Sequence, residues 1–223
     1  MHTKKIFCIV LAVVLAISCL ALAGCQTKSE IKGINNTASG DGTESSAADS
    51  SGSYKNPYTG DSDTVVIDVK DYGKITVKLD KKVAPISVEN FLNLVNEGFY
   101  DGLTFHRIIK GFMIQGGDPQ GNGTGGSSTT IKGEFSANGV ENNLAHKRGV
   151  ISMARSSDYD SASSQFFIVH EDSPHLNGQY AAFGEVTDGM DVVDKIAETV
   201  QVEDSNGTVL PANQPVINSI KIV

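Results

Sequence analysis

Short runs in which apolar and polar residues alternate recur along the chain after residue 63. Two of them, 65–69 and 75–79, flank the turn-forming residues Asp71-Tyr72-Gly73, and this arrangement predicts a β-hairpin. The run 216–222 alternates in the same way, as is typical of a strand with one buried face. Further strands are predicted at 150–153, 165–169 and 181–186.

Two other segments carry apolar residues at the spacing of an amphipathic helix. In the first, Pro85 suits the helix start and Gly98 its end. The apolar stripe between them consists of Val88, Phe91, Leu92 and Val95. The second helix is indicated by Met190, Val193, Ile196 and Ala197. Many short strands with two helices predict a mainly β domain, closed and mostly antiparallel.

The first 25 residues have the organisation of an export signal. Met1 to Lys5 is basic, Ile6 to Ala23 is almost wholly apolar, and Leu22-Ala23-Gly24-Cys25 follows. We expect residues 1–24 to be a signal peptide. The ending resembles the bacterial lipobox, which implies cleavage before Cys25 and a lipid on its thiol. An uncleaved membrane anchor is the alternative, and both place the body outside the cytoplasm, attached to the cell membrane.

Cys25 is followed by a stretch, 26–62, that is rich in Ser, Gly, Thr, Asn, Asp and Ala. It has no sustained apolar periodicity, so it cannot bury enough surface to offset the entropy of ordering. The sequence therefore predicts that 25–62 is a lipidated cysteine with a disordered linker, and that the folded domain spans 63–223.

Charge and cysteine content exclude several kinds of site. The formal net charge of −8 argues against nucleic acid as a partner, because phosphate binding needs a cationic face. It also disfavours adsorption to an anionic bilayer, so a membrane link must be a lipid or a spanning segment. Cys8, Cys19 and Cys25 all precede the expected domain, which can form neither an internal disulfide nor a Cys-ligated zinc site.

The run from Phe105 to Asp118 sets a guanidinium and an amide among large apolar side chains. If the turn at Lys110-Gly111 keeps the strand register, Arg107 and Gln115 share one face of a hairpin. Placing the permanently charged guanidinium of Arg107 beside apolar groups costs free energy, so its presence there suggests a functional role. The alternative is an ordinary strand residue whose guanidinium reaches out to water.

Three sequence blocks resemble the cyclophilins, the peptidyl-prolyl cis-trans isomerases. The first is Phe-His-Arg-Ile-Ile-x-Gly-Phe-Met-x-Gln-Gly-Gly-Asp at 105–118. The second joins Gly149-Val150-Ile151-Ser152-Met153-Ala154-Arg155 to Ser163-Ser164-Gln165-Phe166-Phe167-Ile168, and the third runs from His175 to Gly184. The blocks lie in the family's order, and the resemblance covers about 64–223.

This resemblance implies a closed eight-stranded antiparallel barrel capped by two α-helices. It implies prolyl isomerase activity on proline-containing unfolded or exported polypeptides, by a monomer that needs no cofactor and no metal. Arg107 matches the catalytic arginine. The implied substrate-binding residues are Phe112, Met113, Gln115, Ala154, Arg155, Gln165, Phe167, His175, Leu176 and Tyr180.

The chain departs from the best-known family pattern at three of these positions. His175 stands where many eukaryotic members carry a tryptophan important for cyclosporin binding, so weak binding of that compound is expected. Tyr180 replaces a groove histidine and Arg155 replaces an asparagine. The Tyr180 ring can still offer an apolar face, and the position of Arg155 is thought to meet substrate through its backbone.

Other interpretations of the chemistry are weaker. Gly121 to Gly126 matches G-x-G-x-x-G, but the polar, β-prone residues after it argue against a dinucleotide site. Ser152 lacks a hydrolase context, and Asp158 and Asp160 lack EF-hand spacing. His106 is expected to pack on the opposite strand face from Arg107. A non-catalytic chaperone or adhesin that binds proline peptides is the alternative function; a solute-binding lipoprotein would need a longer chain.

Overall fold

The structure is a computed structural model, and it describes residues 54–223. These residues belong to one compact unit of the chain. The expected signal peptide, Cys25 and the expected linker up to residue 53 lie outside the described residues. Within 54–223, no helix combines the length and the apolar character that crossing a bilayer requires.

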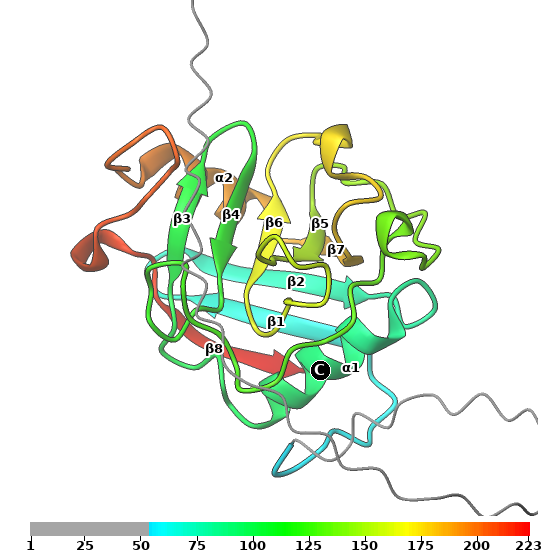
Figure 1. The fold of residues 1–223 in the computed structure, drawn as a ribbon. Helices are drawn as coiled ribbons and strands as arrows, with labels where there is room; N and C mark the ends of the chain where they lie inside the picture. The colour runs from blue at the N-terminus through cyan, green and yellow to red at the C-terminus, as the bar shows by residue number, and fades with distance from the viewer. Residues whose placement is uncertain (1–53) are drawn as a thin grey trace, which may run out of the picture. The chain divides into compact units, whose positions relative to one another are not determined.

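Eight antiparallel strands form one curled sheet in the order β3-β4-β6-β5-β7-β2-β1-β8 (Figure 1). The helices are α1 (Pro85–Asn96) and α2 (Met190–Thr199). Each strand and helix predicted from the hydrophobic pattern is confirmed, with small shifts at the ends. The strands are β1 (Thr64–Val69), β2 (Gly73–Leu79), β3 (Phe105–Ile109), β4 (Met113–Gly116), β5 (Val150–Met153), β6 (Phe166–Val169), β7 (Ala182–Asp188) and β8 (Ile217–Ile222).

The predicted closure of the barrel by a continuous ladder is not confirmed. The edge strands β3 and β8 approach each other, but among the described residues only the isolated bridge between Thr104 and Val216 links their ends. One reason is that another segment occupies the outer edge of β3, where residues 207–209 form backbone hydrogen bonds of 2.8 and 3.0 Å. The bonds of 2.8 and 2.7 Å between 102–103 and Ile217 join the start of β8 to the residues that lead into β3.

Two apolar clusters lie on opposite faces of the sheet. Alternation along β6 divides its side chains between them, as the two-residue repeat of a strand requires. Phe166 and Ile168 join the main core, which α1 covers through its apolar stripe. Phe167 and Val169 join a second cluster with Met113 on the outer face. This part of the sheet is therefore buried on both sides.

The described part of the expected linker, residues 54–62, lies against α1, and we call it the N-terminal strap. The Tyr54 hydroxyl donates a hydrogen bond of 2.6 Å to Asn90 Oδ1. The Tyr58 amide donates another of 2.6 Å to Asn93 Oδ1. Both asparagines are buried. Ordered contacts therefore begin before residue 63, because two buried polar groups on α1 find their partners in the strap.

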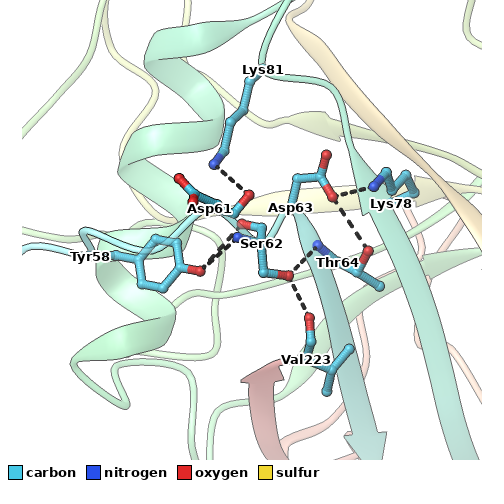
Figure 2. Close-up of polar contacts among 8 residues, drawn as sticks. All are labelled: Tyr58, Asp61, Ser62, Asp63, Thr64, Lys78, Lys81 and Val223. Carbon is cyan, nitrogen blue, oxygen red and sulfur yellow. Dashed lines mark hydrogen bonds and ion pairs between the residues drawn. The ribbon is translucent and has the colours of Figure 1, made fainter.

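The C-terminal end of the strap is held beside β1 (Figure 2). The Ser62 amide donates to the Tyr58 hydroxyl at 3.1 Å, and the Ser62 hydroxyl donates to the carbonyl of Val223. Lys81 Nζ donates to the carbonyl of Asp61 at 3.3 Å. The strap is thus bonded to the domain at both of its ends.

We predict that Tyr54→Phe lowers the free energy of unfolding by about 1 kcal/mol, because it removes one partly buried hydrogen bond to Asn90. Burial, with smaller contributions from Glu89 and Glu97, already raises the pKa of Tyr54 to about 12. Urea denaturation measures the change. Tyr72→Phe is the matched control, since the Tyr72 hydroxyl bonds to no group within 54–223. Equal stability of the Tyr54 variant and the parent would show that the hydrogen bond to Asn90 does not stabilise the domain in solution.

Candidate active site

Strand register brings the guanidinium and the amide of the 105–118 run together on the outer face of the sheet. Arg107 of β3 pairs with Gln115 of β4, and Ile109 pairs with Met113. The turn at Lys110-Gly111 therefore keeps the register, and the expected sharing of one face is confirmed. A slip of one residue would have turned the guanidinium toward the core.

A groove of about 490 Å³ lies over this face. Its apolar floor comes from the outer cluster, in which Met113, Phe167 and Leu176 are buried. A second pocket of about 330 Å³ shares part of its wall. Nine of the predicted site residues line the groove: Arg107, Phe112, Met113, Gln115, Ala154, Arg155, Phe167, Leu176 and Tyr180.

The Arg107 guanidinium is held by hydrogen bonds along the groove wall. Nε donates to the carbonyl of Asn206 at 2.8 Å, and Nη2 donates to Asn206 Oδ1 at 3.2 Å. Nη1 donates to Gln115 Oε1 at 3.2 Å. Partial burial lowers the pKa of Arg107, whereas Tyr180 and Asp204 favour its charged form. The cation is therefore fixed at the groove in the unliganded protein.

Two glutamines connect Arg107 to the glycine-rich loop. Gln115 Nε2 donates to Gln165 Oε1 at 2.9 Å. Gln165 Nε2 in turn donates to the carbonyls of Gly125, at 2.7 Å, and Gly123, at 3.2 Å. Each side-chain amide accepts a hydrogen bond through its oxygen on the Arg107 side and donates one through its NH₂ on the loop side. The orientation of both amides is therefore fixed.

The buried carboxylate of Asp118 organises the glycine-rich loop. It accepts backbone N–H groups from Gln120 at 2.8 Å, Asn122 at 3.0 Å and Gly123 at 2.6 Å. Burial alone would raise the pKa of Asp118, but these hydrogen bonds outweigh it and lower the pKa. Asp118 was not among the predicted site residues. Its bonds shape the loop to which Gln165 is attached.

Phe167, in the groove floor, is packed between two other rings. The His146 ring stacks on it with centroids 6.1 Å apart, and the Tyr180 ring meets it edge-on at 5.9 Å. His146 is itself fixed by Ser152 Oγ at 3.0 Å and Asn177 Oδ1 at 3.2 Å. Ser152 is fully buried, so its hydroxyl supports the floor and does not face the groove as a nucleophile would.

Two predicted site residues lie away from the main groove. Gln165 lines the second pocket, and its amide is bonded within the protein. His175 is exposed and lines neither the groove nor the second pocket. Its ring lies 5.4 Å from that of Phe112, centroid to centroid. His175 therefore reaches the groove only through Phe112.

One wall of the groove comes from a segment to which the sequence analysis assigned no function. Its lining residues are Asn206, Thr208, Val209, Leu210 and Pro211. Gly207 makes this possible: its φ is +81°, and a side chain there would collide with the carbonyl of Ile108. The pair Asn206-Gly207 is a recognisable turn signal. Sequence alone did not show that the turn would meet β3.

The remaining motifs have structural roles. No α-helix begins directly after the glycine-rich loop 121–126, and the next helical turn is the short 3₁₀ helix Ser136–Asn138, so the context of a dinucleotide site is missing. The Asp160 carboxylate accepts one hydrogen bond from the backbone N–H of Gly133 at 3.0 Å and another from the side-chain Nδ2 of Asn138 at 2.7 Å. Within 54–223, no group of three or more His, Cys, Asp or Glu side chains is placed to hold a metal.

The prediction that His106 packs on the strand face opposite Arg107 is not confirmed, because the β3–β4 register shifts between Phe105 and Arg107 and both residues line the groove. His106 is 4 % exposed, and neither ring nitrogen has a hydrogen-bond partner among residues 54–223. Burial lowers the pKa of His106; Asp118 opposes this shift and Arg107 adds to it. The folded protein therefore keeps this imidazole neutral below the pH at which an exposed histidine is protonated.

We predict that His106 makes the domain less stable as the pH falls below about 6.5. Below that pH the unfolded chain binds a proton at His106 that the folded protein does not bind. The free energy of unfolding therefore falls as the pH decreases from about 6.5 to the lowered pKa of His106 in the folded protein. The His106→Gln variant should have a flatter profile, by up to about 1.4 kcal/mol per pH unit. Urea denaturation between pH 7.5 and 5 measures both slopes. Equal slopes would contradict the prediction.

Comparison with known sequences identifies related proteins. The family model for cyclophilin type peptidyl-prolyl cis-trans isomerase/CLD matches residues 64–222. Peptidyl-prolyl cis-trans isomerase B of Bacillus subtilis is 51% identical over 123 residues, covering 55% of this chain and 82% of the relative. Peptidyl-prolyl cis-trans isomerase A of Dickeya dadantii is 45% identical over 161 residues, covering 68% and 80%.

Comparison with solved structures agrees. The crystal structure of a Cryptosporidium parvum cyclophilin type peptidyl-prolyl cis-trans isomerase, in the presence of the dipeptide Ala-Pro, matches with a TM-score of 0.63. The sequence identity is 33%, and the match covers 72% of this chain and 98% of that one.

Proposed function

Because the chain belongs to the cyclophilin family and is a peptidyl-prolyl cis-trans isomerase, we propose that Arg107 lowers the barrier by donating a hydrogen bond to the prolyl nitrogen. The observation that carries this proposal is the position of its guanidinium, fixed at the edge of an apolar groove. The groove would hold the proline while the peptide bond turns.

The reaction makes one chemical demand. Amide resonance gives the X–Pro bond a rotation barrier of roughly 18–20 kcal/mol, so uncatalysed exchange takes tens of seconds or longer. Exchange in milliseconds requires the barrier to fall by about 5–6 kcal/mol. No covalent bond breaks, so no nucleophile is needed. The enzyme must bind the twisted amide more tightly than the planar one.

Arg107 can meet this demand because twisting changes the prolyl nitrogen. In the planar amide the nitrogen lone pair is delocalised and accepts poorly; in the twisted amide it is localised and accepts well. A guanidinium has five N–H donors. The bonds to Asn206 and Gln115 use three of them within the described part of the chain. The remaining donors can serve the transition state without reorganisation.

The apolar floor supplies the second half of the mechanism. Met113, Phe167 and Leu176 are buried, and Phe112 is half-buried beside them. A proline ring seated on these side chains is fixed while the preceding carbonyl rotates. Ala154 lies at the boundary of the two pockets, where the substrate backbone would pass.

We also propose that the enzyme acts on exported polypeptides from a lipid anchor on the outer side of the bacterial cell membrane. The basic start, the apolar core and the Leu22-Ala23-Gly24-Cys25 ending support this location. The absence of cysteine after residue 25 fits an oxidising compartment. Stable attachment requires two or more acyl chains on the terminal cysteine, since one chain binds only marginally.

We predict that Arg107→Ala lowers kcat by about 100- to 1,000-fold, the usual loss when one donor to a transition state is removed. Binding of an Ala-Pro-containing tetrapeptide should change little, because the planar substrate gains little from the guanidinium. Two-dimensional exchange NMR measures the catalysed rate, and chemical-shift titration measures binding. Arg148→Ala, at an arginine outside both pockets, is the matched control and should keep the parent rate.

A catalysed rate that Arg107→Ala leaves intact would refute the mechanism. Peptide binding by the parent without accelerated exchange would favour the alternative, a chaperone or adhesin that only holds proline segments. The two outcomes are separable because exchange and binding are measured on the same samples.

We predict that Cys25→Ser abolishes lipid attachment and releases the chain from the membrane fraction of a bacterium that processes lipoproteins. Mass spectrometry of the parent should show a diacylated N-terminal Cys25, because the thiol is the site of attachment. Cys19→Ser, inside the apolar core, is the matched control and should remain lipidated. A parent chain that still begins at Met1 would identify an uncleaved anchor and overturn the prediction.

A further inference from the structure

The Arg155 guanidinium lies among three aromatic rings. Its central carbon is 4.7 Å from the ring centroid of Tyr180, 4.9 Å from that of Tyr159 and 5.1 Å from that of Phe135. Each distance is within the range at which a cation is attracted to the face of an aromatic ring. One side chain thus joins the groove wall to the loop that contains Tyr159 and to the buried Phe135.

Hydrogen bonds to main-chain oxygens fix the guanidinium in this position. Nε and Nη2 donate to the carbonyl of Gln179 at 3.1 and 2.9 Å, and Nη1 donates to the carbonyl of Ser156 at 2.8 Å. Gln179 immediately precedes Tyr180. Arg155 therefore holds Tyr180 twice, through the ring and through the adjoining backbone.

Tyr180 passes this constraint to the floor of the groove. Its ring is half-buried, lines the groove and meets Phe167 edge-on at an interplanar angle of 83°. A Tyr180 side chain released from Arg155 could rotate away from Phe167 and open one wall of the proline pocket. The shape of the pocket thus depends on the Arg155 guanidinium, which packs on aromatic rings and donates hydrogen bonds to backbone carbonyls of the protein itself.

We propose that Arg155 is a positioning residue, which keeps the Tyr180 ring in the orientation that binds the substrate proline. The inference rests on the proposed function in one respect, that this groove is the site of isomerisation. Arg155 and Tyr180 are in direct contact, and the tyrosine ring gives the guanidinium a face to pack on.

This role predicts a change in substrate affinity. Without the guanidinium, Tyr180 occupies the competent orientation for only part of the time, and the apparent affinity falls by that fraction. Because the loss affects planar and twisted amides alike, KM rises while kcat stays constant. We expect Arg155→Met to raise KM about 3- to 10-fold, as a cation–π contact of ordinary strength would give.

The experiment compares three variants of the full chain by exchange NMR over a range of Ala-Pro tetrapeptide concentrations. Arg155→Met removes the charge at similar length. Arg155→Lys keeps the charge but loses the planar fork, and should give an intermediate KM. Lys195→Met removes a cation 5.0 Å from the Tyr72 ring, outside both pockets, and should behave like the parent. Spectra of ¹³C-labelled tyrosine should show a changed ring chemical shift for Tyr180 in Arg155→Met, because a side chain that rotates about χ1 loses its edge-on contact with Phe167.

An unchanged KM in Arg155→Met, or an unchanged ring chemical shift of Tyr180, would overturn the proposal. A lower maximal rate at constant KM would also overturn it, since that pattern reports fewer folded molecules. If Arg155→Met does not fold, the KM of Arg155→Lys decides in the same way. The proposal for Arg107 is tested separately, because loss of Arg107 lowers kcat at nearly constant KM.

Discussion

The two-residue repeat of the β-strand is the constraint on which both the core and the groove depend. Along β6, Phe166 and Ile168 face the main core, and Phe167 and Val169 face the outer cluster. Two of these four residues therefore fill the interior, and the other two belong to the cluster that forms the floor of the groove. Because both faces are close-packed, the floor cannot shift without disturbing the core, and this rigidity suits a groove that must discriminate between two shapes of one peptide bond.

The second requirement is a charge that stays beside apolar side chains without moving. A guanidinium near Phe167 would lose hydration unless protein groups replaced the water. Asn206 and Gln115 replace it, and Gln165 carries the network on to a loop shaped by Asp118. In the proposed mechanism the donors of Arg107 are thus aligned before the substrate arrives, so little reorganisation is left for the reaction itself. A buried carboxylate with no direct access to the groove sets the position of one end of the network.

Periodicity predicted the strands and helices because the patterns of two and of three to four residues report burial directly. It also predicted that Arg107 and Gln115 share a face, since a tight turn joins their strands. The wall formed by Asn206 was not predictable in this way. Nearly a hundred residues separate Asn206 from Arg107, and only the Asn206-Gly207 turn hinted at it. The strap is held by Asn90 and Asn93 of α1. The composition of the linker does not indicate these partners, because they lie in another part of the chain. Full closure of the barrel is not confirmed, because the hydrophobic pattern does not report which segment will occupy a sheet edge.

The covered edge of β3 has a consequence for an enzyme that acts on peptidyl-prolyl bonds of polypeptides. An open strand edge offers unpaired N–H and C=O groups, and an extended polypeptide can add itself there as a further strand. Here residues 207–209 take up hydrogen-bonding groups of β3, and 102–103 take up those of Ile217 in β8. An extended segment is thereby denied a template for β-augmentation along β3.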